Sequence, residues 1–121
     1  NVKNAKVLIM GLTFKENVAD IRNSKVFDVY QELRNFGLKP MVWDPIADRE
    51  EALHEYGIEL VNIDEVEHAE AVVAAVSHKK ILALDPAELL KKCGHGAPFI
   101  DVKAVWDREK LEEIGWRIWR L

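Results

Sequence analysis

The sequence predicts a single α/β domain built on a Rossmann-like, doubly wound and mainly parallel sheet of about five strands. Short apolar runs alternate along the chain with segments of helical periodicity. Turn or helix-capping residues bound these segments, and parallel strands require crossover helices of this kind between them. The 121 residues are enough for one hydrophobic core without metal or disulfide support. We therefore expect residues 1–121 to form one domain.

The first strand and the first helix are predicted within residues 6–36. Lys6–Met10 is almost continuously apolar, as expected for a strand in a sheet that is covered on both faces. Asn23 or Ser24 can cap the helix that follows, and Gly37 suits the position just after its end. The apolar residues of this helix recur at helical spacing, at Val26, Val29, Tyr30, Leu33 and Phe36.

The second strand is predicted in residues 38–43. Asp44 and the proline after it favour a turn at the end of this strand. Asp48 and Glu51 have the spacing of a capping box, which predicts a short helix that stops at Gly57.

The second half of the chain is predicted to add three strands, in residues 69–76, 98–102 and 116–119. A helix in residues 86–92 begins with an Asp-Pro pair, which combines an N-cap with a proline in the first turn. Another helix is capped by Asp107 and ends before the last strand, which we expect at the edge of the sheet.

Composition narrows the classes of partner and compartment. The net charge of −4 argues against nucleic acid as the main partner, because duplex binding usually needs a basic face. No apolar run approaches the roughly 20 residues that span a bilayer, so we expect no membrane insertion. Residues 1–6 lack the apolar stretch of a signal peptide, and the single cysteine excludes an internal disulfide. We expect cytoplasmic residence.

Residues 11–24, between the first strand and the first helix, are the most informative segment. Ligands commonly bind at such a turn, because backbone N–H groups and the helix dipole converge there. Lys15 and Arg22 add two fixed cations to this turn. The segment therefore predicts an anionic ligand, with phosphate or pyrophosphate the best match.

Two features of this segment leave an alternative open. The lone Gly11 does not form the Gly-x-Gly-x-x-Gly loop of common dinucleotide folds, so side chains would have to contribute more than glycine backbone does. Lys15 and Arg22 can also belong to a solvated loop in which they pair with Glu16 and Asp20.

The wording Gly-Leu-Thr-Phe-Lys-Glu-Asn-Val-Ala-Asp-Ile-Arg-Asn-Ser resembles the start of the UDP-binding, C-terminal domain of the UDP-glucose/GDP-mannose dehydrogenase family. It is most similar to the branch that oxidises UDP-N-acetylhexosamines at C6. The resemblance extends over nearly the whole chain, through Trp43-Asp44-Pro45, His54-Glu55-Tyr56-Gly57-Ile58 and Asp101-Val102-Lys103.

The resemblance implies roles for four residues. Phe14 and Lys15 would contact the UDP-sugar substrate, and Lys103 would contact UDP. Independently of the resemblance, the aromatic ring of Phe14 can lie against the base or ribose of a bound nucleotide. Arg22 would face NAD, the cofactor that the N-terminal domain binds. Some relatives that use UDP-glucose have a nucleotide-binding arginine near the position of Lys103, whereas this chain has lysine, as in the N-acetylhexosamine branch.

The resemblance also implies a reaction that this segment cannot perform alone. Such enzymes oxidise the C6 hydroxyl to a carboxylate in two NAD-dependent steps through a cysteine-linked intermediate, for polysaccharide biosynthesis. Their catalytic cysteine, NAD glycine loop and general base belong to N-terminal and central domains. We therefore expect this chain to be an inactive fragment, monomeric or weakly associated, of an enzyme that is a homo-oligomer at full length.

Other acidic and hydroxyl residues receive structural interpretations. We interpret Asp20 as bracing the loop or Arg22, Ser24 as a helix cap, and Asp101 as orienting the loop that carries Lys103. Asp44 after the second strand suggests turn initiation. A phosphoacceptor role for Asp44, as in response-regulator receivers, would need paired acids after the first strand, where this chain has Gly-Leu.

The remaining candidates give no catalytic assignment. The four histidines (His54, His68, His78 and His95) show no metal-ligand spacing and are assigned no role. Cys93 lies at the carboxyl end of a predicted helix, where the dipole raises the pKa of a thiol. Trp106, Trp116 and Trp119 suggest packing or a docking surface. A rival interpretation of the whole chain is a free-standing nucleotide-binding or regulatory module without catalysis.

Overall fold

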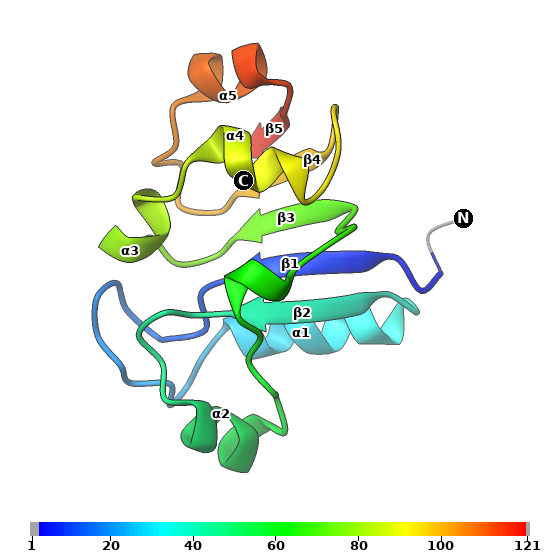
Figure 1. Cartoon of the computed structure of the whole chain (residues 1–121). Coiled ribbons are helices and arrows are strands. Elements are labelled where there is room, and N and C mark those ends of the chain that lie inside the picture. The colour runs from blue at the N-terminus through cyan, green and yellow to red at the C-terminus, as the bar shows by residue number, and fades with distance from the viewer. Residues whose placement is uncertain (1–2, 121) are drawn as a thin grey trace.

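The computed structural model describes residues 3–120, which form a five-stranded, wholly parallel sheet in the order β2-β1-β3-β4-β5 (Figure 1). The strands are β1 (Lys6–Met10), β2 (Lys39–Trp43), β3 (Ala71–Ala74), β4 (Pro98–Asp101) and β5 (Arg117–Arg120). The helices are α1 (Val26–Asn35), α2 (Arg49–Tyr56), the 3-10 turn η1 (Ile63–Glu65), α3 (Lys79–Leu82), α4 (Pro86–Lys91) and α5 (Arg108–Ile114). The predicted fold class and the five strands are confirmed.

Alternate residues of the strands point to two separate cores. Leu8 and Met10 of β1 pack on one face of the sheet against α3, α4 and α5, in a cluster that includes Ile81, Leu89 and Leu111. Val7 and Ile9 point to the opposite face, where the cluster includes Val26 of α1 and Ala52 of α2. Strand β1 is thus an interior strand buried on both faces, which explains its nearly continuous apolar sequence.

Local capping signals explain the starts of α2, α4 and α5. Asp48 and Asp107 accept hydrogen bonds from the backbone N–H groups of Glu51 and Lys110, at 3.0 and 3.2 Å. Gly57 has the left-handed φ of +67° that ends α2, as predicted. Strand β3 is shorter than the predicted residues 69–76, and the other predicted strand ends differ by at most one residue. Helix α3 is not predicted, because its four residues are too few to show periodicity.

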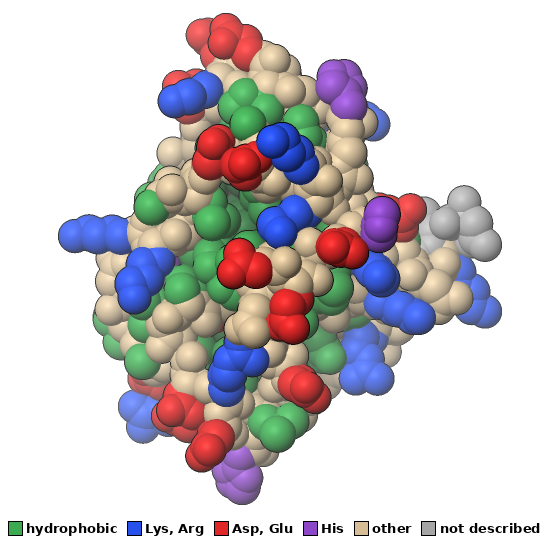
Figure 2. Space-filling view, in the orientation of Figure 1, with side chains coloured by type: hydrophobic (Ala, Val, Ile, Leu, Met, Phe, Trp, Pro, Cys, Tyr) green, Lys and Arg blue, Asp and Glu red, His purple; other side chains and the backbone are tan. Residues whose placement is uncertain are grey.

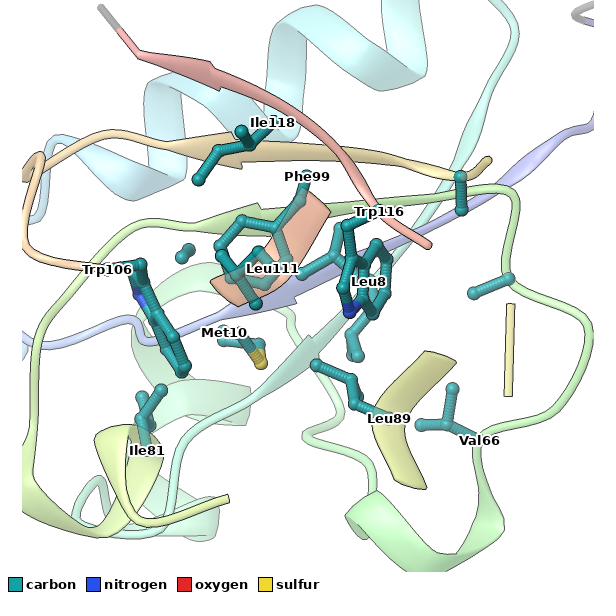
Figure 3. Packing of buried hydrophobic residues seen from close by; sticks show 14 residues of the cluster. Leu8, Met10, Val66, Ile81, Leu89, Phe99, Trp106, Leu111, Trp116 and Ile118 are labelled. Atoms are coloured by element: carbon teal, nitrogen blue, oxygen red, sulfur yellow. The ribbon is translucent and has the colours of Figure 1, made fainter. Parts of the chain in front are cut away.

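Two of the three grouped tryptophans belong to the core, which corrects the suggestion of a common docking surface. Trp106 and Trp116 are buried, and each packs edge-to-face on Phe99 with ring centroids 5.1 and 5.2 Å apart (Figure 3). Trp119 lies on β5 and is 53% exposed. The two buried rings therefore stabilise the face under α4 and α5.

The connections of β1 create a switch point in the sheet. The chain passes from β1 to β2 on one side and then returns to β3 on the other, so the loops after β1 and β3 diverge at their carboxyl ends. In Figure 1 this edge lies at the left, where the long loop after β1 and helix α3 gather. Such a position is where open α/β sheets bind ligands.

Candidate functional site

A cavity of about 430 Å³ opens at this switch point. It is lined by residues of the loop after β1, of α1 and of the ends of β3 and β4: Thr13, Phe14, Lys15, Glu16, Lys25, Val26, Val29, Val73, Ala75, Val76, Val102 and Lys103. Phe14 and Lys15 belong to one predicted ligand motif and Lys103 to another, and the fold brings all three to one cavity.

The chemistry of the cavity is amphipathic and cationic. Valine and alanine residues make up half of its lining, and Phe14, which also lines it, is 49% exposed. Three lysines line it, including Lys25, which the sequence did not single out, against one carboxylate from Glu16. This combination can hold a flat or apolar group and an attached polyanion.

Asp44 holds the backbone at the base of this loop. Its Oδ2 accepts hydrogen bonds from the backbone N–H groups of Leu12 and Thr13, at 2.7 and 3.1 Å. Its Oδ1 accepts from Ile46 and Ala47, at 2.7 and 2.9 Å, which is the turn predicted after β2. Asp44 therefore ties the loop after β1 to the end of β2, a link between strands that sequence spacing does not reveal.

Hydrogen bonds stabilise the charged form of the Asp44 carboxylate. Burial disfavours this charge and by itself would raise the pKa of Asp44. Hydrogen bonds from His78 and from backbone amides outweigh burial and lower the pKa from 3.8 to about 2. The carboxylate is therefore ionised throughout the physiological pH range.

His78 is the most important residue that sequence reasoning missed. Its side chain is wholly buried, and its Nε2 lies 3.0 Å from both Asp44 Oδ2 and Thr13 Oγ1. Its Nδ1 accepts a hydrogen bond of 2.7 Å from the backbone N–H of Asn17. His78 has no metal-ligand spacing, so the sequence assigns it no role. No other sequence pattern marks it, because its hydrogen-bond partners are 34 to 65 residues away along the chain.

Arg22 lies apart from the cavity. Its guanidinium pairs with Asp20 through Nε–Oδ1 and Nη2–Oδ2 distances of 3.0 and 3.1 Å, and its side chain is 79% exposed. This side-chain hydrogen bond lowers the pKa of Asp20 below its ordinary value. Asp20 thus braces Arg22 as predicted, and of the two pairings that the solvated-loop alternative named, the one with Asp20 is present.

Asp101 shapes the loop that carries Lys103. Its buried carboxylate accepts from the backbone N–H of Val105 at 3.3 Å and of Trp106 at 2.9 Å. Arg120 approaches the same carboxylate, with Nε 3.7 Å from Oδ2. The prediction that Asp101 orients this loop is confirmed.

The interpretation of Ser24 as a helix cap is wrong. Lys25 occupies the N-cap position of α1, and Ser24 Oγ instead donates a 2.6 Å hydrogen bond to the carbonyl of Leu12. The hydroxyl of Tyr56 donates to the carbonyl of Ile21 and accepts from the Ser24 amide. Ser24 therefore joins the end of the loop to its start at Leu12. This hydrogen bond is favoured over helix capping because it satisfies a buried carbonyl group.

A larger hollow of about 590 Å³ lies elsewhere, between the loop before β3 and α4. Its charges are mixed and partly paired with one another, as with Lys91 Nζ and Glu88 Oε2 at 2.7 Å. Figure 2 shows acidic and basic side chains interspersed over the displayed face. None of the residues predicted to bind ligand lines this hollow, so the cavity at the switch point is the candidate site.

Cys93 is expected to alkylate at least tenfold more slowly in the native chain than in urea. Burial raises the pKa of its thiol from 9.0 to about 11, so at pH 7.5 very little reactive thiolate exists. The sequence also predicts a raised pKa for this thiol, from the helix dipole, but burial is the main cause in the structure. Mass spectrometry after timed iodoacetamide treatment measures both rates, and equal rates would contradict this account.

Within residues 3–120 no group of three or more His, Cys, Asp and Glu side chains is arranged to hold a metal ion. In the same range no helix has both the length and the apolar character needed to cross a bilayer.

Comparison with known proteins assigns a family to this arrangement. Residues 8–108 match the UDP-glucose/GDP-mannose dehydrogenase family, UDP binding domain. Protein CapL of Staphylococcus aureus is 37% identical over 122 residues, which cover 99% of this chain and 28% of that protein. The UDP-N-acetyl-D-glucosamine 6-dehydrogenase of Pseudomonas aeruginosa is 38% identical over 113 residues, which cover 93% of this chain and 26% of that enzyme.

Solved structures support the same fold. The crystal structure of an NDP-N-acetyl-D-galactosaminuronic acid dehydrogenase from Methanosarcina mazei Go1 matches 98% of this chain and 25% of its own, with a TM-score of 0.86 and 20% identity. The UDP-N-acetyl-mannosamine dehydrogenase Cap5O from Staphylococcus aureus matches 98% of this chain and 26% of its own, with a TM-score of 0.69 and 22% identity. The chain thus spans about a quarter of the length of its relatives.

Proposed function

This chain belongs to the UDP-glucose/GDP-mannose dehydrogenase family, as its UDP-binding domain, and we propose that its switch-point cavity binds the uridine diphosphate of a UDP-N-acetylhexosamine. The observation that carries this proposal is the convergence of Phe14, Lys15 and Lys103 on one cavity. The choice of an N-acetylhexosamine rests on the named substrates of relatives at 38% and 44% identity.

The lining suits the two chemically distinct parts of UDP. Lys15 and Lys103 supply ammonium groups for the diphosphate, and charge-assisted hydrogen bonds of this kind are stronger than neutral ones. The exposed ring of Phe14 offers a surface for the uracil base or the ribose. The buried Val73 and Val76 also line the cavity, so a nucleotide there would be partly withdrawn from water.

The contribution of this domain to catalysis is positional. A nucleotide held at two ends presents its sugar in a fixed orientation, which lowers the entropic barrier to reaction. We propose that C6 oxidation with NAD uses a cysteine and a general base from other domains of the same enzyme, and that this chain alone is inactive. The enzyme as a whole would be a homo-oligomer.

Arg22 fits the NAD-facing role in this scheme. Its exposed guanidinium lies outside the lining of the nucleotide cavity and is held out by Asp20. A cation displayed in this way can reach a cofactor phosphate on an adjoining domain. Asp20 would keep Arg22 extended before that contact forms.

Lys15→Ala is expected to weaken UDP binding by roughly tenfold or more, the usual effect of losing one charge-assisted hydrogen bond. Isothermal titration calorimetry of the purified chain with UDP measures the change. Lys39→Ala is the matched control, because it removes the same charge at the start of β2, the opposite edge of the sheet. Equal effects of the two substitutions would contradict placement of the diphosphate beside Lys15.

A further inference from the structure

The loop that carries Phe14 and Lys15 is held at both ends by a buried side chain from another part of the fold. His78 lies after β3, and its Nε2 contacts Thr13 Oγ1, which in turn donates a 2.8 Å hydrogen bond to the carbonyl of Lys15. On the other side of the ring, Nδ1 accepts the N–H of Asn17. The hydroxyl of Thr13, before Phe14 and Lys15, and the backbone N–H of Asn17, after them, are thus both held by one imidazole.

The hydrogen bonds determine which nitrogen of His78 carries the proton. Nδ1 accepts from a backbone N–H, so the proton of the neutral ring is on Nε2. Thr13 Oγ1 uses its own hydrogen toward Lys15, so it accepts at Nε2, as does the ionised Asp44 Oδ2. Each polar atom of the ring therefore has a partner that only this tautomer satisfies.

Asn17 adds a second attachment between the loop and the same region. Its Oδ1 accepts a 2.8 Å hydrogen bond from the backbone N–H of Lys79, the residue after His78. Its backbone has a left-handed φ of +61°, a conformation that asparagine tolerates better than most residues. The loop and the start of α3 are thereby joined through reciprocal hydrogen bonds.

We propose that His78 and Asn17 are positioning residues for nucleotide binding, which act by holding the loop from Thr13 to Asn17 in its binding-competent conformation. The inference rests on the proposed function, because its consequence is the affinity for UDP. Phe14 and Lys15 are themselves exposed, so no burial of their own side chains fixes them. A loop already ordered before the ligand arrives loses less conformational entropy on binding.

His78→Gln separates this role from stability of the core. The glutamine amide can still donate from the Nε2 position to Asp44 and Thr13, but it provides no acceptor at the Nδ1 position. We expect roughly tenfold weaker UDP binding and faster hydrogen exchange at the Asn17 amide, with little change in Tm. His78→Asn places an oxygen near the Nδ1 position instead, so it is expected to retain protection of the Asn17 amide and to lower Tm.

Asn17→Gly tests the second attachment without touching the core. Glycine tolerates positive φ, so the substitution chiefly removes the hydrogen bond to Lys79. Asn23→Gly is the matched control, because Asn23 lies on the same connection with a φ of +57° and lines no part of the cavity. We expect UDP affinity to fall severalfold for Asn17→Gly and to stay within twofold of the unsubstituted chain for Asn23→Gly.

The outcomes are distinguishable. A change in UDP affinity that merely follows the loss of Tm, or equal losses for Asn17→Gly and Asn23→Gly, would overturn the positioning role. Unchanged UDP affinity in His78→Gln would also overturn it. Failure of the unsubstituted chain to bind UDP would overturn the proposed function itself, and unchanged exchange of the Asn17 amide in His78→Gln would separately show that His78 does not hold the loop.

Discussion

Gly11→Ala is expected to lower the free energy of unfolding by about 3 kcal/mol or more, the combined cost of backbone strain and overpacking. Gly11 has a φ of +106°, a backbone conformation that residues with a Cβ rarely adopt. A Cβ at this position would lie 2.6 Å from Val76 Cβ and 3.0 Å from the Val76 backbone nitrogen. The first side-chain atom of Val76 and its backbone cannot move aside cheaply, because they belong to the packed loop after β3.

Gly57→Ala is the control for strain alone. Gly57 also has a positive φ, at +67°, but a Cβ there would meet nothing within 4 Å. We expect a loss of only about 1 kcal/mol for this variant. Urea unfolding followed by tryptophan fluorescence gives both values, and comparable losses would show that close packing at the switch point does not restrict Gly11.

Asp44→Asn is expected to cost about 3 kcal/mol of stability, the scale for leaving buried charged or polar partners unpaired. The carboxylate accepts from four backbone N–H groups and from His78, so either orientation of an amide would direct an N–H toward other donors. Asp107→Asn is the matched control, because that carboxylate is an exposed N-cap that asparagine replaces well. Chemical denaturation measures both, and similar small losses would contradict the buried network.

Acid unfolding gives an independent test of the same carboxylate. The folded pKa of about 2 lies below the ordinary value of 3.8, so ionised Asp44 stabilises the fold above pH 3.8. This contribution, about 2 kcal/mol, is lost as the pH falls from 3.8 through 2. Asp44→Asn should remove that part of the pH dependence. A variant whose stability falls as steeply as that of the wild type over this interval would contradict the assignment.

The fold was predictable because its signals are local. The apolar run of Lys6–Met10 and the caps at Asp48 and Asp107 are each contained within a few consecutive residues. Helix α3 escaped prediction because it has one turn, and its buried Ile81 forms no periodic pattern. Ser24 was misassigned because a hydroxyl before a helix has the same sequence context whether it caps the helix or bonds to a distant carbonyl.

The candidate site likewise contains residues that local sequence motifs predict and a residue that they do not. Phe14, Lys15 and Lys103 were chosen by motif, and parallel topology explains why segments so far apart in sequence meet at one edge. His78 could not be found by these means, because its role comes from contacts with Asp44, Thr13 and Asn17 that only the folded chain creates. No sequence pattern distinguishes a buried histidine that holds a loop from a histidine at the surface.

Binding of UDP in the switch-point cavity is expected to change the amide chemical shifts of the residues that line it. The ¹⁵N-labelled chain would be titrated with UDP and, separately, with GDP. We predict saturable shifts at Thr13, Phe14, Lys15 and Lys103 with UDP, and weaker effects with GDP. Shifts confined to the hollow beside α4, or no shifts with UDP at all, would contradict the account.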